Sequence, residues 1–118
     1  MKTKSVAMET KPLTILMLLN ATPAWLSLSR EQRDEYFRHH VLPLFNDQDL
    51  NVRLFDSEYF HGKVSDFLII TVHRLEAYQL FIERLRDTEV YGKPYFDVVD
   101  IIPGQENAFR EFNKILLS

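Results

Sequence analysis

Four stretches of the chain alternate in the manner of β-strands, yet they are apolar at both the odd and the even positions. These stretches are Leu13 to Asn20, Val52 to Phe60, Phe67 to Val72 and Pro94 to Ile102. A period of two predicts strands, and apolar residues at both parities predict strands that are shielded from water on both faces. The sequence therefore predicts a small sheet that needs a cover on each side.

In the segments between and after these strands, apolar residues recur at intervals of three and four, as they do in helices. A first helix is predicted to begin at Ser29, because Ser29 and Gln32 have the spacing of a capping box, and to end near Pro43. A second helix follows the third strand and directs Leu75, Tyr78, Ile82 and Leu85 inward. A third helix is predicted from Glu106 to Leu117, after the break at Pro103 and Gly104.

This order of elements is that of a ferredoxin-like α+β sandwich, βαββαβ, with a C-terminal helix added. Right-handed crossovers place the strands of its four-stranded antiparallel sheet in the order fourth, first, third, second. We expect one domain over residues 12–118, preceded by a flexible polar tail over residues 1–11. Both helices of the repeat then cover the same face of the sheet.

Alternate side chains of a strand point to opposite faces of the sheet, so the parity of a residue, its odd or even place along the strand, assigns it to one of two rows. The row predicted to lie under the helices is Ile15, Met17, Leu19, Val52, Leu54, Leu68, Ile70, Val72, Phe96 and Val98. The row predicted on the open face is Thr14, Leu16, Leu18, Asn20, Arg53, Phe55, Ser57, Phe67, Ile69, Thr71, His73, Tyr95, Asp97, Val99 and Ile101. The middle of the open row is apolar, and an exposed patch of this kind is larger than monomers usually carry. We therefore predict a homodimer of the dimeric α+β barrel type, in which each open face buries about 800 Å².

Composition narrows the classes of function. The 118 residues carry a formal charge of −3 and no cysteine. Negative charge argues against a nucleic-acid or anionic-membrane surface, and Leu16 and Leu18 occupy the central-strand positions where an RNA-binding sheet carries aromatic residues. The lack of cysteine excludes thiolate and disulfide chemistry and makes a reducing cytoplasm the expected compartment. We expect no cofactor.

Candidate site residues gather at the two rims of the predicted sheet. At one rim Asn20, Ser57 and Asp97 meet, and the loops that carry Trp25 and His61 would close over them. A histidine and a carboxylate there would share acid and base work. The alternative is a solvated rim whose polar residues cap strand ends, with Trp25 as a packing anchor.

The opposite rim brings together Arg53, Thr71 and His73. Arg53 would offer a planar fork for a carboxylate, and His73 would titrate near neutral pH. The alternative is that Arg53 pairs with an acid of the other protomer and that His73 caps the following helix. We expect no metal site, because the acids Asp56, Glu58, Asp66, Asp97 and Asp100 lack a fixed ligand spacing.

Four segments of the chain have a recognisable sequence. They are Ala21 to Leu26 with Arg30 and Arg33, Ser65 to Thr71, Ile82 to Thr88, and Phe96 to Gly104 with Glu106 and Asn107. Through these segments the chain resembles the darcynin family of small bacterial proteins over about Leu13 to Phe112. The family is functionally uncharacterised, so the resemblance implies a shared fold and a bacterial origin but no activity.

Three functions remain open on the sequence. The first is a homodimer that binds a small apolar molecule. The second is a cofactor-independent enzyme, resembling an isomerase or a monooxygenase, that uses Asp97 with His61 or His73. The third is a protein-interaction module.

Overall fold

A computed structural model describes residues 11–118, so the expected flexible tail over residues 1–11 lies, apart from Lys11, outside the described residues. The four strands are β1 (Leu13–Ala21), β2 (Leu50–Asp56), β3 (Asp66–Val72) and β4 (Phe96–Gly104). The longer helices are α2 (Arg30–Tyr36), α3 (Leu75–Arg86) and α5 (Phe109–Leu116). Two short helices, α1 (Pro23–Leu26) and α4 (Glu89–Gly92), add to the predicted set. The predicted α+β fold with one four-stranded antiparallel sheet is confirmed.

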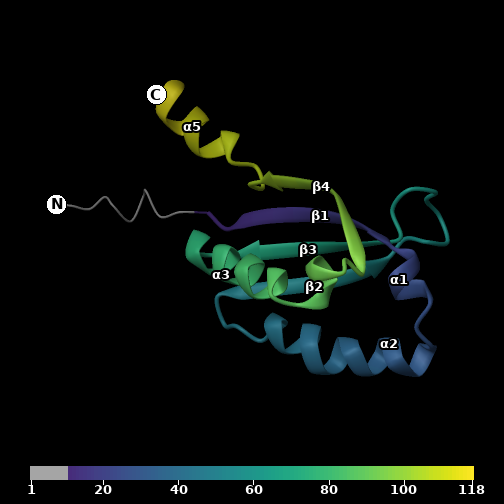
Figure 1. The fold of residues 1–118 in the computed structure, drawn as a ribbon. Coiled ribbons are helices and arrows are strands. Elements are labelled where there is room, and N and C mark those ends of the chain that lie inside the picture. The colour runs from purple at the N-terminus through teal and green to yellow at the C-terminus, as the bar shows by residue number, and fades with distance from the viewer. Residues whose placement is uncertain (1–10) are drawn as a thin grey trace.

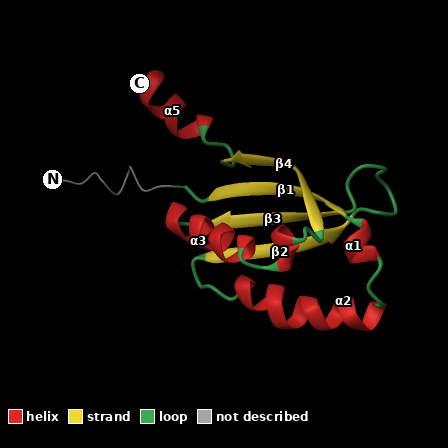
Figure 2. Ribbon diagram, viewed as in Figure 1, coloured by secondary structure: helices red, strands yellow, loops and turns green. Residues whose placement is uncertain are grey.

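The strands lie in the order β2, β3, β1, β4, and every neighbouring pair is antiparallel, as predicted. Figure 1 shows α3 lying across the sheet, α2 running along the β2 side, and α5 standing apart beyond the end of β4. Figure 2 shows the same arrangement by secondary structure, with α3 in front of the strands and α2 below β2. No helix among residues 11–118 is long and apolar enough to cross a membrane.

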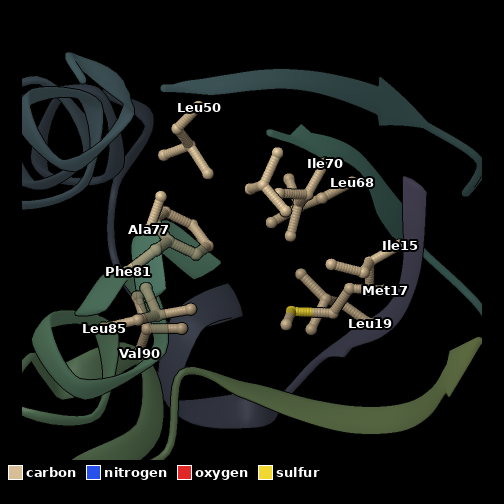
Figure 3. Packing of buried hydrophobic residues seen from close by; sticks show 11 residues of the cluster. Ile15, Met17, Leu19, Leu50, Leu68, Ile70, Ala77, Phe81, Leu85 and Val90 are labelled. Carbon is tan, nitrogen blue, oxygen red and sulfur yellow. The ribbon is translucent and has the colours of Figure 1, made fainter. Parts of the chain in front are cut away.

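The core lies between α3 and the sheet. Figure 3 shows Ile15, Met17 and Leu19 of β1 and Leu68 and Ile70 of β3 facing the side chains of α3 and α4, which are Ala77, Phe81, Leu85 and Val90. These strand residues belong to the row that parity placed under the helices. Two members of that row depart from it, because Leu54 is 43% exposed and Val98 is 37% exposed.

A β-bulge divides β4 in two. Leu19 is opposite Val98, whereas Leu18 is opposite Asp100, so that Val99 has no partner of its own on β1. An inserted residue of this kind reverses the parity of everything after it.

The bulge corrects the prediction for the second half of β4. Ile101, predicted on the open face, is opposite Met17 and so shares the face of the core. Ile102 is opposite Leu16 and takes its place on the open face. The prediction for Ile101 was wrong because a simple alternation was extended across an irregularity.

The first helix begins as the sequence predicted and ends differently. Gln32 N–H donates to Ser29 Oγ at 3.1 Å, and Ser29 N–H donates to Gln32 Oε1 at 2.9 Å, which confirms the capping box. Beyond Tyr36 the helix continues as a π-helical turn, η2 (Phe37–Val41), and a 3₁₀ turn, η3 (Leu42–Phe45). Pro43 lies inside this last turn.

The other face of the sheet has no cover within residues 11–118. Phe55 of β2 and Phe67 of β3 stack there with ring centroids 4.9 Å apart, and the Arg53 guanidinium lies 4.9 Å from the centre of the Phe55 ring. Leu16 and Ile69 are half-buried on the same face. This open face is apolar at its centre, as the sequence indicated.

Candidate functional site

A cavity of about 490 Å³ lies between α2 and the helix side of the sheet. It sits at the rim where β1 and β2 end and β3 and β4 begin, which is one of the two rims selected from the sequence. Its apolar walls are formed by Leu19, Ala21, Trp25, Leu26, Phe37, Val41, Phe45, Leu54, Leu68, Phe81, Leu85, Val90 and Phe96. Its polar residues are Asn20, Arg30, Arg33, Asp34, Asp56, Glu58, Ser65 and Asp66.

The helix α2 continues without a break through η2 and η3, and we call residues 30–45 the α2 segment. Two aromatic clusters connect this segment to the rest of the fold. At the first, the Trp25 ring lies 5.2 Å from the rings of both Tyr95 and Phe96, and Tyr36 of α2 meets Tyr95 edge-on at 5.0 Å. Tyr95 is only 4% exposed, so its predicted place on the open face was wrong. The rings form a bulky contact between α2 and the sheet rim.

The second cluster lies at the other end of the segment. Phe45 of η3 is 6.0 Å from Phe37 and 6.1 Å from Phe81 of α3, measured between ring centroids. Val41 and Phe45 of this segment pack against the core and also line the cavity. Leu54 of β2 faces the cavity and stays 43% exposed, although it belongs to the strand positions that face the core.

Polar contacts fix the first cluster in place. The buried Thr22 has its Oγ1 at 2.8 Å from Pro94 O and 3.0 Å from Tyr95 O, where a hydroxyl proton is shared between two acceptors. The Tyr36 hydroxyl accepts from Glu89 N–H at 2.7 Å and so joins α2 to α4. Burial raises the pKa of Tyr36, which keeps its hydroxyl neutral.

One side of the α2 segment faces the cavity. Arg30, Arg33, Asp34, Phe37 and Val41 recur at spacings of three and four residues and all line it. The π-helical turn lies in this stretch, and such turns occur often at functional sites.

Three carboxyl groups stand on the opposite wall. Oxygens of Asp56, Glu58 and Asp66 lie within 4.8 Å of one another, since Asp56 and Asp66 are directly opposite across β2 and β3. Burial is the largest cause that raises the pKa of Asp66 from 3.8 to about 6. A hydrogen bond from Ser65 lowers this pKa, whereas the hydrogen bond and charge of Asp56 and the charge of Glu58 raise it further. Asp66 therefore changes its protonation near neutral pH. Carboxylates are also ligands for hard cations, and the absence of a metal site stays a prediction.

The residues predicted for this rim are only partly brought together. Asn20 and Trp25 line the cavity, and Asn20 is opposite Asp97 across β1 and β4. Ser57 donates its backbone N–H to Ser65 O at 2.7 Å and lies outside the lining. Asp97 is exposed on edge strand β4.

His61 has a local role in its loop. Its Nδ1 accepts from the backbone N–H of Lys63 at 3.1 Å and of Val64 at 3.0 Å. A ring nitrogen used in this way stabilises the turn between β2 and β3.

The residues of the opposite rim lie away from the cavity. Arg53 rests over Phe55 on the open face, and Thr71 is half-buried on β3. His73 is exposed, and the cap position of α3 is occupied by Arg74 with no side-chain hydrogen bond to the helix. The expectation that His73 caps this helix was therefore wrong.

Most residues of the cavity were not predicted as site residues, among them Arg33 and Asp66. Arg33 appeared only as part of a family resemblance, and Asp66 only as one acid of a scattered series. The helical recurrence of Arg30, Arg33 and Phe37 and the antiparallel register of Asp56 with Asp66 were the signals that could have found them.

Comparison with known proteins identifies relatives of the whole domain. The Darcynin family, described as a domain of unknown function, matches residues 1–115. A Darcynin homolog from Streptomyces avermitilis is 36% identical over 100 residues, which cover 83% of this chain and 82% of the relative. Darcynin 1 from Acinetobacter baumannii is 34% identical over 88 residues, covering 74% of this chain and 98% of the relative.

Similar solved structures are chlorite dismutases. A variant from Candidatus Nitrospira defluvii in complex with cyanide superposes with a TM-score of 0.72 at 14% identity, covering 98% of this chain and 50% of the other. A dimeric chlorite dismutase from Nitrobacter winogradskyi gives a TM-score of 0.62 at 13% identity, covering 80% of this chain and 56% of the other. The chain thus spans about half the length of these proteins, and the likeness shows a shared fold alone.

The raised pKa of Asp66 predicts a specific pH dependence of stability. Folded Asp66 holds a proton that the unfolded chain releases between pH 3.8 and about 6, so this residue lowers the free energy of unfolding as the pH rises through that window. Urea unfolding at pH 4 and pH 8 should show that Asp66→Asn gains stability relative to wild type at pH 8. Glu83→Gln, at an exposed position of α3, is the matched control, and its free energy of unfolding should change between pH 4 and pH 8 by the same amount as that of wild type. The same change in Asp66→Asn as in wild type would contradict the raised pKa of Asp66.

Proposed function

This chain belongs to the darcynin family, and from that premise we propose that it binds a small molecule in the cavity between α2 and the sheet. The volume of the cavity carries the proposal. At about 490 Å³ it falls within the range of roughly 300 to 1,000 Å³ that is typical of small-molecule sites.

The lining of the cavity supports an apolar ligand. Phe37, Val41, Phe45 and Leu68 present carbon surface, and the polar residues stand at the two walls. Leu54 is exposed to this space, so a ligand in contact with it would remove apolar surface from water. A mostly apolar space with a few placed polar groups is the usual form of such a site.

We further propose that the protein is a homodimer that pairs the open faces of two sheets, in the cytoplasm. The stacked Phe55 and Phe67, with Leu16 and Ile69, supply the apolar centre of that interface. The helix α5 adds a second apolar surface, since Phe112 is 60% exposed and Leu116 is 77% exposed. A second copy of the chain is the occupant that fits, because a protein of similar fold, the chlorite dismutase from Nitrobacter winogradskyi, is dimeric.

A bulky side chain at Leu54 tests the cavity. In Leu54→Trp the indole should occupy the space beside β2 and lower the affinity for the anionic aromatic dye 1-anilinonaphthalene-8-sulfonate by about tenfold, which corresponds to about 1.4 kcal/mol. The control is Leu80→Trp, because Leu80 is 44% exposed on α3 and lies outside the lining. Dye fluorescence titrations measure both. An equal affinity in the two variants would place the dye elsewhere and remove the main support for the proposal.

A charge on the open face tests the dimer. Wild type should sediment at about twice its protomer mass of 14.0 kDa, and Ile69→Lys should sediment as a monomer because it places a charge in the apolar interface. Leu80→Lys is the control on the helix side and should stay dimeric. A wild-type protein that sediments at 14.0 kDa would overturn this part of the proposal.

Asp66 favours a second candidate function, that of a cofactor-independent enzyme that transfers a proton. A carboxyl group that titrates near pH 6 beside an apolar cavity is suited to act as a general acid or base. The sequence assigned this role to Asp97 with a histidine, whereas the cavity brings Asp66 and Asp56 to the space where a substrate would lie.

The enzyme hypothesis predicts a pH-dependent rate. With a carbonyl compound that exchanges its α-proton in deuterated water, followed by NMR, the rate should follow a titration with an apparent pKa of about 6. Asp66→Asn should reduce the rate at least about a hundredfold, the lower range for loss of a positioned acid or base. Asp97→Asn should leave the rate unchanged. If the protein binds the compound but exchanges its α-proton no faster than buffer does, the enzyme hypothesis is wrong and the binding function stands.

A further inference from the structure

Arg33, which lines the cavity, carries a buried donor without a partner. Arg33 Nε has no exposed surface and no hydrogen-bond acceptor among the described residues. No ion pair within residues 11–118 involves Arg33 or its neighbour Arg30. A buried N–H that bonds to nothing is uncommon in folded proteins, and a charged one is especially unfavourable.

The position of Arg33 relates this donor to the cavity. Arg33 lies on α2 one turn before Phe37, and both line the space above Leu68. Its guanidinium group has a planar fork of N–H donors, which matches the two oxygens of a carboxylate. Arg30, one turn earlier on the same side, adds a second positive charge.

We propose that the ligand is an apolar carboxylic acid whose carboxylate pairs with Arg33, an inference that rests on the proposed binding function. The carboxylate would pair with the part of the Arg33 guanidinium that lines the cavity, and the apolar part would lie against Phe37, Phe45 and Leu68. The ligand thereby supplies the negative charge partner that Arg33 and Arg30 lack within residues 11–118.

The charges around the cavity favour a single negative charge on the ligand. Asp56, Glu58 and Asp66 stand together on the β2 and β3 wall, and Asp34 on α2 is already paired with Arg38 at 3.0 Å. A phosphate, with nearly two negative charges, would be repelled more strongly by the acidic wall than a carboxylate. A monocarboxylate directed at α2 keeps its charge beside the arginines.

Two matched pairs of probes test the inference. They are 4-phenylbutanoate with 4-phenylbutan-1-ol, and decanoate with decan-1-ol, each titrated by calorimetry at pH 8. Wild type should bind each acid at least about tenfold more tightly than its alcohol, because the alcohol cannot satisfy the guanidinium fork. Arg33→Gln should lose that preference while its affinity for the alcohols stays unchanged, and Arg33→Lys should restore part of it.

The control and the outcomes separate this inference from the function on which it rests. Arg84→Gln, at an exposed arginine of α3 that lies outside the cavity and forms no ion pair within residues 11–118, should keep the preference for acids. Thermal unfolding should show that Arg33→Gln is folded. Equal binding of acid and alcohol by wild type would overturn the carboxylate assignment and leave the cavity as a binding site. Failure of all four probes to bind would overturn both.

Discussion

A sheet that is apolar on both faces, with helices available for one, is the constraint on which the rest of this structure depends. The residues of β1 show it plainly, since Ile15 and Met17 are buried against the helix layer while Leu16 and Leu18 point to the other side. The helix layer itself is unequal. The helix α3 packs closely on the strands, whereas α2 is kept away from them.

Aromatic contacts hold the helical segment that contains α2 at both of its ends. Trp25, Tyr36 and Tyr95 form a rigid contact at one end of the α2 segment, and Phe45 forms another with Phe81 at the other end. Between these two contacts Val41 and Leu44 pack against the core, and Val41 also lines the cavity. The cavity is therefore a consequence of packing in the domain itself, and it does not require the second copy of the chain that the open face calls for.

Local sequence signals predicted much of the fold. The alternation in β1 and β3, the order of the strands and the capping box at Ser29 follow from short-range periodicity and local hydrogen bonding, which one sequence records directly. The bulge at Leu18 and Leu19 does not follow from it, because alternating apolar residues fit β4 in either register. The site was harder to predict for a related reason. Parity directed attention to the open face, whereas the cavity depends on how far α2 stands from the sheet, a distance set by rings far apart in the sequence.

The two faces of the sheet divide the proposed tasks between alternate residues of the same strands. On β2, Leu54 faces the ligand cavity while its neighbour Phe55 faces the open side, and on β3 Leu68 and Phe67 are related in the same way. A substitution at one parity can change the cavity without touching the proposed interface, and a substitution at the other parity can do the reverse. Because the likeness to chlorite dismutases shows only a shared fold, the chemistry of the cavity has to be judged from its own residues. The arginines of α2 and the carboxyl groups of β2 and β3 stand on opposite walls of one apolar space, and this separation of charge gives a ligand a preferred orientation.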